Sequence, residues 1–541
     1  MKKFVLITGL LVTPVAADQA AIDIDGRFAD WSGITPAVVD PIGDVPPGAL
    51  DIGRVWLADD PDRLAIRIEA SAEFALADRD TLRILIDTDN DASTGYLSGG
   101  FGAELYFDFG DLEGRFFATT TTNPSSGVQI WHSDFGLQGQ PTVTSDEFEI
   151  ALARDATIEG TNLFNGSTIR IRLVDDGGER IPDTSIGIEY ELDAGTPPDM
   201  RDESIGRQQP TDVRHISWNV RFDSPWDQAL RPSFGRILAA LDADIMSFQE
   251  IYDHDGDDVV DFVDDWVQAD PSGTWHVASN YDCHTVSRYP VLASEAIDGN
   301  LAVLLDTTSV LDRTTLIINA HLSCCDNDQS RQQEIDRILR FIRQVRNGQQ
   351  AGYPIDCALI ITGDLNLVGL AQQLDSLIEG DIVAEATYGS DVAIDVDGTE
   401  LRDVICLQTD ARLAYTWRND FGWYWPGRLD FTILSDSVLE VGTRVTIETD
   451  RMSPEKRSEY GLFAADSACS DHRPLVTDLR VPGCPGDLDG NGRVDGGDLS
   501  ILLSDWGDCD DPDECVADLN ADAVINGGDL SIILGFWGPC S

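Results

Sequence analysis

Ala358-Leu-Ile-Ile-Thr-Gly-Asp-Leu-Asn366 is the stretch that decides the fold, because an apolar run leads directly into two polar residues. A short, β-branched apolar run of this kind predicts a buried strand that ends near Thr362. Asp364 and Asn366 are two residues apart, so we expect them to emerge at the strand end on one face. A sheet that presents polar groups in this way is a rigid scaffold for a catalytic site.

Four further motifs place polar residues after strand-like runs, in a specific order along the chain. They are Ile216-Ser-Trp-Asn219, Ser247-Phe-Gln-Glu250, Asn319-Ala-His321 and Ser470-Asp-His472, and Arg428-Leu-Asp430 precedes the last of them. Paired strand patterns alternate with helical patterns between the motifs. Residues 211–482 are therefore predicted to form a four-layered α/β domain, with two β-sheets flanked by helices. The predicted strands are 213–220, 245–250, 301–306, 315–322, 358–362, 429–434 and 474–479, and the predicted helices are 233–241 and 330–345.

The motif residues supply the parts needed to hydrolyse a phosphodiester, which requires an activated water and stabilisation of negative charge on phosphate oxygens. Glu250 is predicted to bind a hard divalent metal, Mg²⁺ or Mn²⁺, with Asn219 beside it and Asp471 as a second ligand. His472 is the predicted general base, and Asp430 is its predicted partner, which fixes the tautomer.

The remaining candidates concern the water and the phosphate. Asp364 and Asn366 are predicted to align the attacking water and a phosphate oxygen, and His321 to donate to the phosphate or the leaving group. Arg288 and Arg331 are candidates for phosphate contacts, although ordinary surface or ion-pair roles are equally open for both.

With these motifs in this order, residues 211–480 resemble the endonuclease/exonuclease/phosphatase family, which includes deoxyribonuclease I, abasic-site endonucleases, sphingomyelinases and inositol-polyphosphate phosphatases. The resemblance implies the same roles for the metal-binding glutamate, the Gly-Asp-x-Asn motif and the closing Asp-His pair. A histidine at His321 places the chain nearer the deoxyribonuclease and sphingomyelinase branches. The acidic partner of this histidine usually lies ahead of a motif like Ser287-Arg-Tyr-Pro290, where this chain has only Asp282 and His284 in a shortened segment.

The first residues predict export. Lys2 and Lys3, the apolar run from Phe4 to Val12 and the small residues Ala16 and Ala17 are typical of a signal peptide over residues 1–17. The apolar run is too short to span a bilayer, and the sequence contains no longer one. We expect a secreted protein, extracellular or at the cell surface, without a transmembrane segment.

Residues 21–195 read as a β-sandwich, followed by a linker at 196–210. Ile24-Asp-Gly26 and Ile86-Asp-Thr-Asp-Asn-Asp91 are similar to segments of family 9 carbohydrate-binding modules, and this resemblance implies a glycan ligand. The acidic residues of the second segment are compatible with a calcium loop or with a solvated hairpin.

An internal repeat closes the chain. Asp487-Leu-Asp-Gly-Asn-Gly-Arg-Val-Asp-Gly-Gly-Asp498 returns 31 residues later as Asp518-Leu-Asn-Ala-Asp-Ala-Val-Ile-Asn-Gly-Gly-Asp529. Oxygen-bearing side chains recur with the spacing of a calcium loop, and apolar residues follow at helical spacing. The predicted Ca²⁺ ligands are Asp487, Asp489, Asn491, Asp495, Asp498, Asp518, Asn520, Asp522, Asn526 and Asp529. Residues 484–541 resemble a dockerin domain, which implies a small all-α module and a cohesin-like protein partner.

The net charge and the cysteine content further limit the possible functions. The net charge of −59, from 96 acidic and 37 basic residues, argues against a broad basic surface for polyanions, but a metal-bearing cleft would still admit nucleic acid. Ten cysteines in an exported chain predict disulfides. In the tail we favour Cys484 with Cys540 and Cys509 with Cys515, because a helix separates the cysteines within each repeat. The sequence leaves the pairing of the six cysteines in residues 211–482 open.

The sequence thus predicts an exported, divalent-metal-dependent phosphodiesterase. The first choice among such enzymes is a nuclease that acts on nucleic acid. Two alternatives stay open within the enzyme class: a phospholipid hydrolase like sphingomyelinase, and an inositol-phosphate hydrolase. A third is a non-catalytic extracellular adhesion or scaffold protein.

Overall fold

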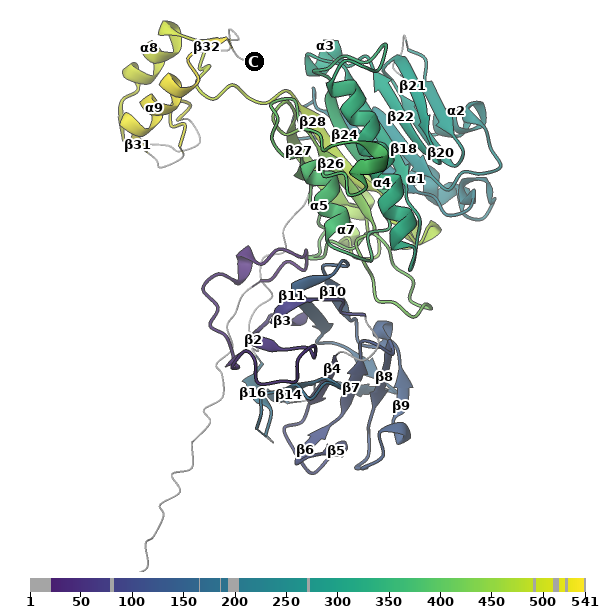
Figure 1. The fold of residues 1–541 in the computed structure, drawn as a ribbon, viewed down its shortest axis with the longest axis vertical. Helices are drawn as coiled ribbons and strands as arrows, with labels where there is room; N and C mark the ends of the chain where they lie inside the picture. The colour runs from purple at the N-terminus through teal and green to yellow at the C-terminus, as the bar shows by residue number, and fades with distance from the viewer. Residues whose placement is uncertain are drawn as a thin grey trace, which may run out of the picture. The chain divides into compact units, whose positions relative to one another are not determined.

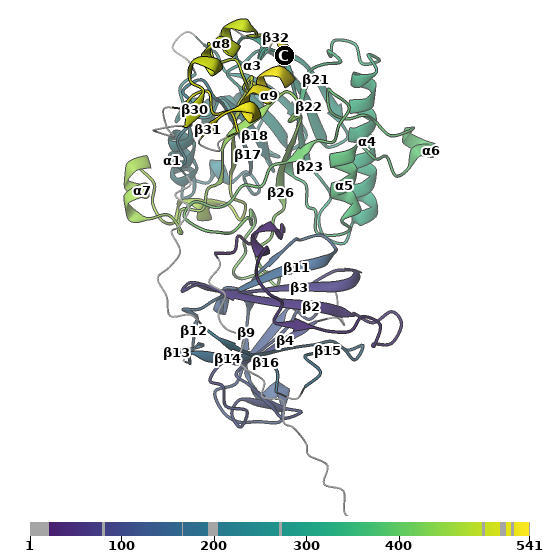
Figure 2. The same cartoon turned by 90° about the vertical axis from the view of Figure 1, so that its left-hand side faces the viewer.

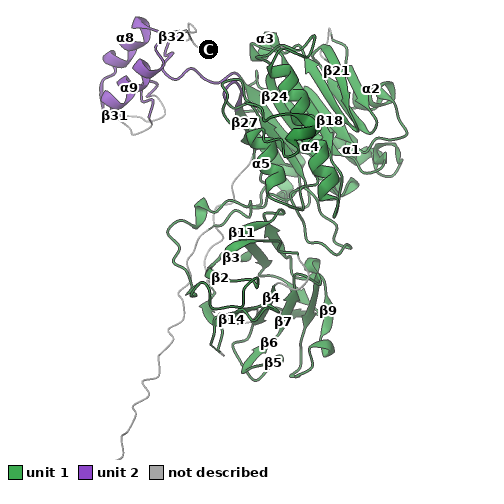
Figure 3. Ribbon diagram, viewed as in Figure 1, with its two compact units in different colours: residues 1–436, 441–480 green, residues 437–440, 481–541 purple. Residues whose placement is uncertain are grey.

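The computed structural model describes residues 21–77, 82–164, 166–184, 186–192, 204–269, 273–489, 493–508, 515–520 and 524–539. They divide into two compact units, residues 1–436 with 441–480 and residues 437–440 with 481–541 (Figure 3). The predicted signal peptide, most of the predicted linker and four predicted tail residues lie outside the described residues. Those four residues are Asn491, Asp522, Cys509 and Cys540.

The N-terminal part of the larger unit is rich in strands, as predicted, and consists mainly of two antiparallel sheets (Figure 1). Their inner faces share one hydrophobic core, to which Ile66, Ile84, Phe107 and Ile150 contribute. The first sheet has the order β1 (Val38–Val39), β2 (Ile52–Asp59), β3 (Arg63–Phe74), β11 (Ser145–Ala153) and β10 (Gln138–Gln140). The second has the order β15 (Arg180–Ile181), β14 (Thr168–Val174), β4 (Arg83–Asp87), β7 (Leu105–Asp108), β8 (Glu113–Phe116) and β9 (Val128–Ile130), and β16 (Ile188–Glu191) also pairs with β14. Two small hairpins are β5 (Tyr96–Ser98) with β6 (Phe101–Ala103) and β12 (Thr157–Ile158) with β13 (Thr161–Asn162).

Two six-stranded sheets form the α/β domain that follows. One has the order β19 (His276–Asn280), β20 (Cys283–Ser287), β18 (Ile245–Gln249), β17 (Val213–Asn219), β28 (Leu475–Arg480) and β27 (Glu440–Thr446). The other has the order β21 (Val291–Ile297), β22 (Asn300–Leu305), β23 (Thr315–His321), β24 (Ala358–Asp364), β26 (Asp430–Leu434) and β25 (Arg402–Asp403). Each sheet contains one parallel pair, β17 with β18 and β23 with β24. Every strand predicted in this region is present.

Helices cover the outer face of each sheet, which gives the four predicted layers (Figure 2). Apolar residues of α1 (Arg231–Leu241) and α2 (Gly256–Asp264) pack on the first sheet, and those of α4 (Asp328–Arg346) and α5 (Gln372–Glu379) on the second. The acidic stretch 253–265 contains α2. Asp255 caps this helix by accepting from the backbone N–H groups of Asp257 and Asp258, and Val259, Phe262 and Val263 bury one face. Shorter helices are α3 (Thr308–Leu311), α6 (Glu385–Tyr388) and α7 (Pro454–Tyr460).

Asn319 of β23 joins the two sheets of this domain and is fully buried. Its side-chain oxygen accepts from Nε2 of Gln249 at 2.7 Å, and its side-chain nitrogen donates to the carbonyl oxygens of Phe248 and His284 at 3.2 and 3.0 Å. These partners lie on β18 and β20 of the other sheet. The asparagine of the Asn-Ala-His motif therefore has a structural role, which is to join the two sheets, rather than a catalytic one.

Replacing Asn319 by alanine is expected to lower the free energy of unfolding of this domain by roughly 3 kcal/mol, because buried polar partners on the other sheet lose their bonds. Denaturant unfolding of the variant measures the change. The matched control is Asn347→Ala at the exposed C-cap of α4, expected to change stability by less than about 0.5 kcal/mol. Equal stability of the two variants would contradict the role of Asn319 in joining the two sheets.

The prediction of disulfides is wrong for four of the six cysteines in the α/β domain. Cys324 and Cys325 bond to each other, whereas Cys283, Cys357, Cys406 and Cys469 are free and buried. Cys357 and Cys469 sit in the hydrophobic cores on opposite sides of the domain. Burial raises the pKa of all four thiols, so they pack as small apolar side chains.

Within the larger unit, the sandwich packs directly against the α/β domain. Trp425 inserts into the sandwich core, with ring centroids 5.6 Å from Phe109 and 6.5 Å from Phe107. The hydroxyl of Thr142 donates to the backbone oxygens of Leu367 and Arg428 at 2.8 and 3.1 Å. The sandwich thus supports the two segments that lead away from Asn366 and into Asp430.

The smaller unit carries two similar helices, α8 (Gly496–Ser504) and α9 (Gly527–Gly535). Leu502 and Ile533, at matching positions of the repeat, are fully buried between them with Val494 and Ile525. Two-residue strands pair as β29 (Arg493–Val494) with β32 (Gly538–Pro539) and β30 (Gly507–Asp508) with β31 (Val524–Ile525). Cys484 and Cys515 each take part in a disulfide bond. Throughout the described part of the chain, every helix is too short or too polar to cross a membrane.

Candidate active site

Strand register brings the polar ends of the second sheet together. His321 of β23 lies opposite Asp364 of β24, and Asp364 lies opposite Asp430, the first residue of β26. Asn219 closes β17 of the facing sheet and donates from its side-chain nitrogen to Oδ2 of Asp364 at 3.0 Å. Residues from four distant parts of the sequence therefore meet at one edge of the two sheets.

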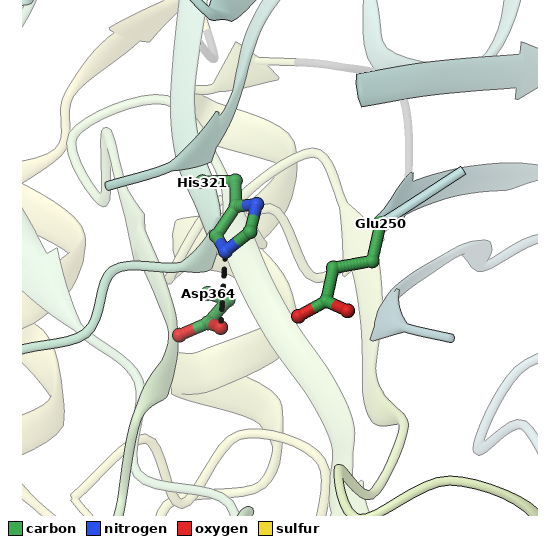
Figure 4. Close-up of side chains that lie close together, drawn as sticks. All are labelled: Glu250, His321 and Asp364. Carbon is green, nitrogen blue, oxygen red and sulfur yellow. Dashed lines mark ion pairs between the residues drawn. The ribbon is translucent and has the colours of Figure 1, made fainter. Parts of the chain in front are cut away.

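Glu250 is the carboxylate that faces this group, and it follows β18 with a left-handed backbone (φ +65°). Its two oxygens accept from the side chain of Asn219 and from the backbone N–H of Phe222, each at 3.0 Å. Figure 4 shows the Glu250 carboxylate directed toward Asp364 and His321. One ligand atom from each of these three residues lies within 4.8 Å of the others.

His472 is buried and takes its orientation from Asp430, as predicted from the sequence. Its Nδ1 lies 2.8 Å from Oδ2 of Asp430, and its Nε2 lies 3.6 Å from Oδ2 of Asp364. The hydroxyl of Ser470 accepts from the backbone N–H of His472 and donates to the carbonyl of Asn219. This explains the serine in the Ser-Asp-His motif.

His321 has a carboxylate partner that the sequence left open. Its Nδ1 lies 2.5 Å from Oδ2 of Asp282, and its Nε2 lies 3.7 Å from Oδ2 of Asp364. Asp282 is buried between β19 and β20. His284, the other residue of the shortened segment, contacts Ser279 and the carbonyl of Ile251 instead. The site thus contains two parallel Asp-His pairs, both directed at Asp364.

The charges of the site shift the pKa values of its members. Burial lowers the pKa of both histidines, but the neighbouring carboxylates outweigh it and raise the pKa of His321 to about 9 and that of His472 to about 10. Burial raises the pKa of Asp364 to about 6, against the attraction of His472. A site so rich in carboxylates favours positive charge, whether protons or a cation.

Among the other predicted site residues, Asn366 joins the cluster and Asp471 lies beside it. The backbone N–H of Asn366 donates to Oδ1 of Asp364, and its side chain donates to the carbonyl of Leu322. Asp471 accepts from the indole nitrogen of Trp417 at 3.3 Å and lies 3.8 Å from the guanidinium of Arg221. It belongs to neither of the two groups of candidate ligands around Asp364 that the described residues form.

The structure does not bring the two candidate phosphate arginines to this cluster. Arg288 forms ion pairs with Asp242 and Asp244 at 2.6 and 2.7 Å. Arg331 is fully buried and bonds to Gln373, Asp328 and the carbonyl of Ser323. Both guanidinium groups are engaged by the protein, and this argues against the phosphate role.

Arg221 is a cationic residue at the site that sequence analysis did not single out. It lies two residues after Asn219, and its backbone N–H donates to the side-chain oxygen of Asn219 at 2.9 Å. Its side chain is 56% exposed. Arg221 could have been identified from the sequence by its position directly after the first motif.

The donor set fits a divalent cation. Glu250 and Asp364 offer carboxylate oxygens, the ligands that Mg²⁺ and Mn²⁺ prefer, within reach of one another. Asp430 adds a buried carboxylate oxygen, Oδ1, to which none of the described residues donates a hydrogen bond. A cation here would offset negative charge that the protein leaves uncompensated.

Residues 216–472 match the model for the Endonuclease/Exonuclease/phosphatase family. This part of the chain is therefore a domain of the Endonuclease/Exonuclease/phosphatase type, and the enzymes of that family are phosphoester hydrolases that use divalent metals. No curated protein matches the chain.

Solved structures similar to the chain include truncated Caenorhabditis elegans TDP2, with 16% identity over 50% of this chain and 98% of that one, at a TM-score of 0.32. D. rerio TDP2 complexed with a single strand DNA product has 19% identity over 50% and 99%, at a TM-score of 0.31. The human Nocturnin catalytic domain has 15% identity over 51% and 96%, at a TM-score of 0.29.

Proposed function

We propose that the protein is a secreted nuclease that cleaves phosphodiester bonds of nucleic acid with Mg²⁺ or Mn²⁺. The observation that carries the phosphodiesterase assignment is the convergence of Glu250, Asp364 and two Asp-His pairs at one edge of the paired sheets. A scaffold protein would have no need for histidines held in this way. The predicted signal peptide supports secretion.

In the proposed reaction, Glu250 and Asp364 hold the cation, with Asp471 as a further proposed ligand. The cation, when bound, polarises the phosphoryl oxygens and neutralises charge in the transition state. His472, aligned by Asp430, takes the proton from the attacking water. The negative charge of Asp364 raises the pKa of His472, so a cation bound there would lower that pKa and favour the unprotonated base.

His321 and Asn366 complete the proposed site. His321, whose Nδ1 is held by Asp282, is positioned to donate a proton from Nε2 toward a phosphate oxygen or the leaving oxygen. Asn366 and Asn219 orient the water and the phosphate. Arg221 is the exposed cation that can contact a phosphate next to the scissile one.

Three aromatic rings beside Glu250 favour a substrate with bases. Phe222, Tyr252 and Tyr281 are 73%, 37% and 74% exposed. The ring centroids of Phe222 and Tyr252 lie 5.9 Å apart, and those of Tyr252 and Tyr281 lie 5.6 Å apart. Exposed rings next to the reacting phosphate suit unpaired bases, which stack on aromatic side chains. A sphingomyelinase-like enzyme, the second candidate, would place the same rings against lipid.

The double variant Phe222→Ala, Tyr252→Ala is expected to raise KM for single-stranded DNA by about 5- to 150-fold, since stacking contributes roughly 1–3 kcal/mol per base. Turnover of bis(p-nitrophenyl) phosphate, which is too small to reach both rings, is expected to stay unchanged. Phe463→Ala, which removes a 61% exposed ring elsewhere on the domain, is the control. Faster turnover of sphingomyelin than of DNA would reverse the order of the two candidates.

For the tail we propose Ca²⁺ loops and a cohesin-like protein partner. Asp487, Asp489 and Asp498 each offer a ligand atom within 4.8 Å of the others. Beyond the buried helix residues, the repeat leaves matching apolar side chains in solvent. These are Leu503, Trp506, Leu534 and Trp537, which are 48–56% exposed. An apolar face of this kind on a small unit supports a docking role.

A glycan ligand for the sandwich stays a proposal. Trp31 and Trp56 are buried, with 1% and 5% of their surface exposed, and so do not offer a ring for stacking on a sugar. Trp131 packs edge-on against Trp423 with centroids 4.9 Å apart.

A further inference from the structure

A group of carboxylates lies at one end of the sandwich, outside the catalytic domain. Residues 40–51, which connect β1 to β2, meet the segment that leads into β15. Asp40, Asp44 and Glu179 each place one carboxylate oxygen within 4.8 Å of the others. Asp51, at the end of the same connection, adds a fourth carboxylate close enough to influence Asp40.

Backbone donors hold these side chains in place. The backbone N–H of Ile52, in the first sheet, donates to Oε2 of Glu179 at 3.0 Å, and that of Arg180 donates to Oε1 at 2.7 Å. The backbone N–H of Gly43 donates to Oδ2 of Asp51 at 2.9 Å. Glu179 thereby links the two sheets, and the group is fixed before any ligand binds.

Two oxygens of the group are buried and receive no hydrogen bond from the residues that the structure describes. They are Oδ2 of Asp40 and Oδ1 of Asp51, in residues that are only 9% and 8% exposed. No ion pair to a basic side chain is found for any of the four carboxylates among the described residues. A buried carboxylate oxygen without a partner is costly, because it loses its hydration without compensation.

The surroundings add negative charge. Burial and the neighbouring carboxylates Asp183, Asp44 and Asp51 all raise the pKa of Asp40. Burial, together with Asp40 and Asp44, also raises the pKa of Glu179. By contrast, the acidic group at Asp87 has the guanidinium of Arg170 at 3.7 Å. In the described part of the chain, no basic side chain pairs with the Asp40 group as Arg170 does with the Asp87 group.

We propose that Asp40, Asp44, Asp51 and Glu179 form a Ca²⁺ site that fastens the β1–β2 connection to the second sheet of the sandwich. The ligands are all oxygens, they come from a connecting segment and a strand end, and they carry more charge than a proton or a water could balance. Ca²⁺ accepts six to eight oxygen ligands in flexible geometry, whereas Mg²⁺ demands a tighter octahedron. The role is structural and independent of the proposed nuclease activity.

The test counts Ca²⁺ ions bound to the full chain by equilibrium dialysis, for wild type, Asp44→Asn and the double variant Asp40→Asn, Glu179→Gln. We expect the double variant to bind one ion fewer, and Asp44→Asn, whose side chain is exposed and cannot disturb the core, to bind that ion on the order of tenfold more weakly. Asp155→Asn, an exposed carboxylate of the same sandwich, is the matched control. An unchanged ion count and unchanged affinities in both variants would overturn the proposal.

Thermal unfolding gives a second, independent readout. In EDTA the double variant should melt at or above the temperature of wild type, because repulsion among carboxylates is relieved. In Ca²⁺ it should melt below wild type, because it cannot gain from the ion. A variant that is more stable than wild type in both conditions would show a mere acidic cluster and overturn the proposal.

Discussion

His472→Ala is expected to lower kcat on bis(p-nitrophenyl) phosphate by about 100- to 10,000-fold, the usual contribution of a positioned general base. The imidazole is held by Asp430 at 2.8 Å and is 5% exposed, so its position is fixed before substrate binds. The loss should fall on kcat rather than KM, because proton transfer occurs in the transition state. Steady-state kinetics in saturating Mg²⁺ measures it.

The control for this prediction is His276→Ala. His276 lies on β19, where it takes no part in the cluster around Asp364, and its replacement should leave kcat within about twofold of wild type, as is usual away from special sites. Circular dichroism and thermal unfolding would verify that both variants are folded. If His472→Ala kept the turnover of the control, another group would have to be the base.

Asp364→Asn is expected to lower kcat by roughly 100- to 1,000-fold, as for the loss of one preorganised electrostatic group. A second effect follows from the charge of Asp364, which raises the pKa of both histidines. Without that charge, the pKa of His321 should fall below about 9 and that of His472 below about 10. Titration of the imidazole resonances by NMR, in the presence of a chelator, measures both shifts.

Asn219 gives a comparison for this variant. Its side chain bonds to the same carboxylate but carries no charge, so Asn219→Ala should weaken turnover while changing both histidine pKa values less than Asp364→Asn does. Histidine pKa values that did not respond to Asp364→Asn would contradict the arrangement in which both imidazoles face one carboxylate.

The sequence predicted the strands that carry the site because each is a short apolar run that ends in a polar motif. Ala358–Asp364 is the clearest case, and the structure extends the predicted strand by only two residues. The partnership of Asp430 with His472 was also predictable, because a histidine that acts as a base needs a carboxylate partner and the Arg428-Leu-Asp430 motif supplies one. These features depend on local pattern, which a sequence displays directly.

What the sequence could not provide depends on register and on loop shape. Asp282 reaches His321 because the turn between β19 and β20 places it there, whereas the shortened segment offered only Asp282 and His284 and did not show that either makes the contact. Arg288 was a candidate for phosphate binding because it belongs to a family-like motif. Its guanidinium instead forms ion pairs with Asp242 and Asp244, which come from a different segment of the chain. The prediction of disulfides failed for four cysteines of the α/β domain because the number of cysteines does not show where each one is buried. Cys357 and Cys469, for example, lie in separate hydrophobic cores.

The central claim is that Glu250, Asp364 and the two Asp-His pairs converge on a bound divalent cation. The most direct measurement is anomalous X-ray scattering from crystals of the protein grown with Mn²⁺. The account predicts a Mn²⁺ ion between Glu250 and Asp364, roughly 2.0–2.3 Å from a carboxylate oxygen of each, and its loss in Glu250→Gln crystals. Strong Mn²⁺ peaks elsewhere on the protein with none at this edge of the sheets would contradict it.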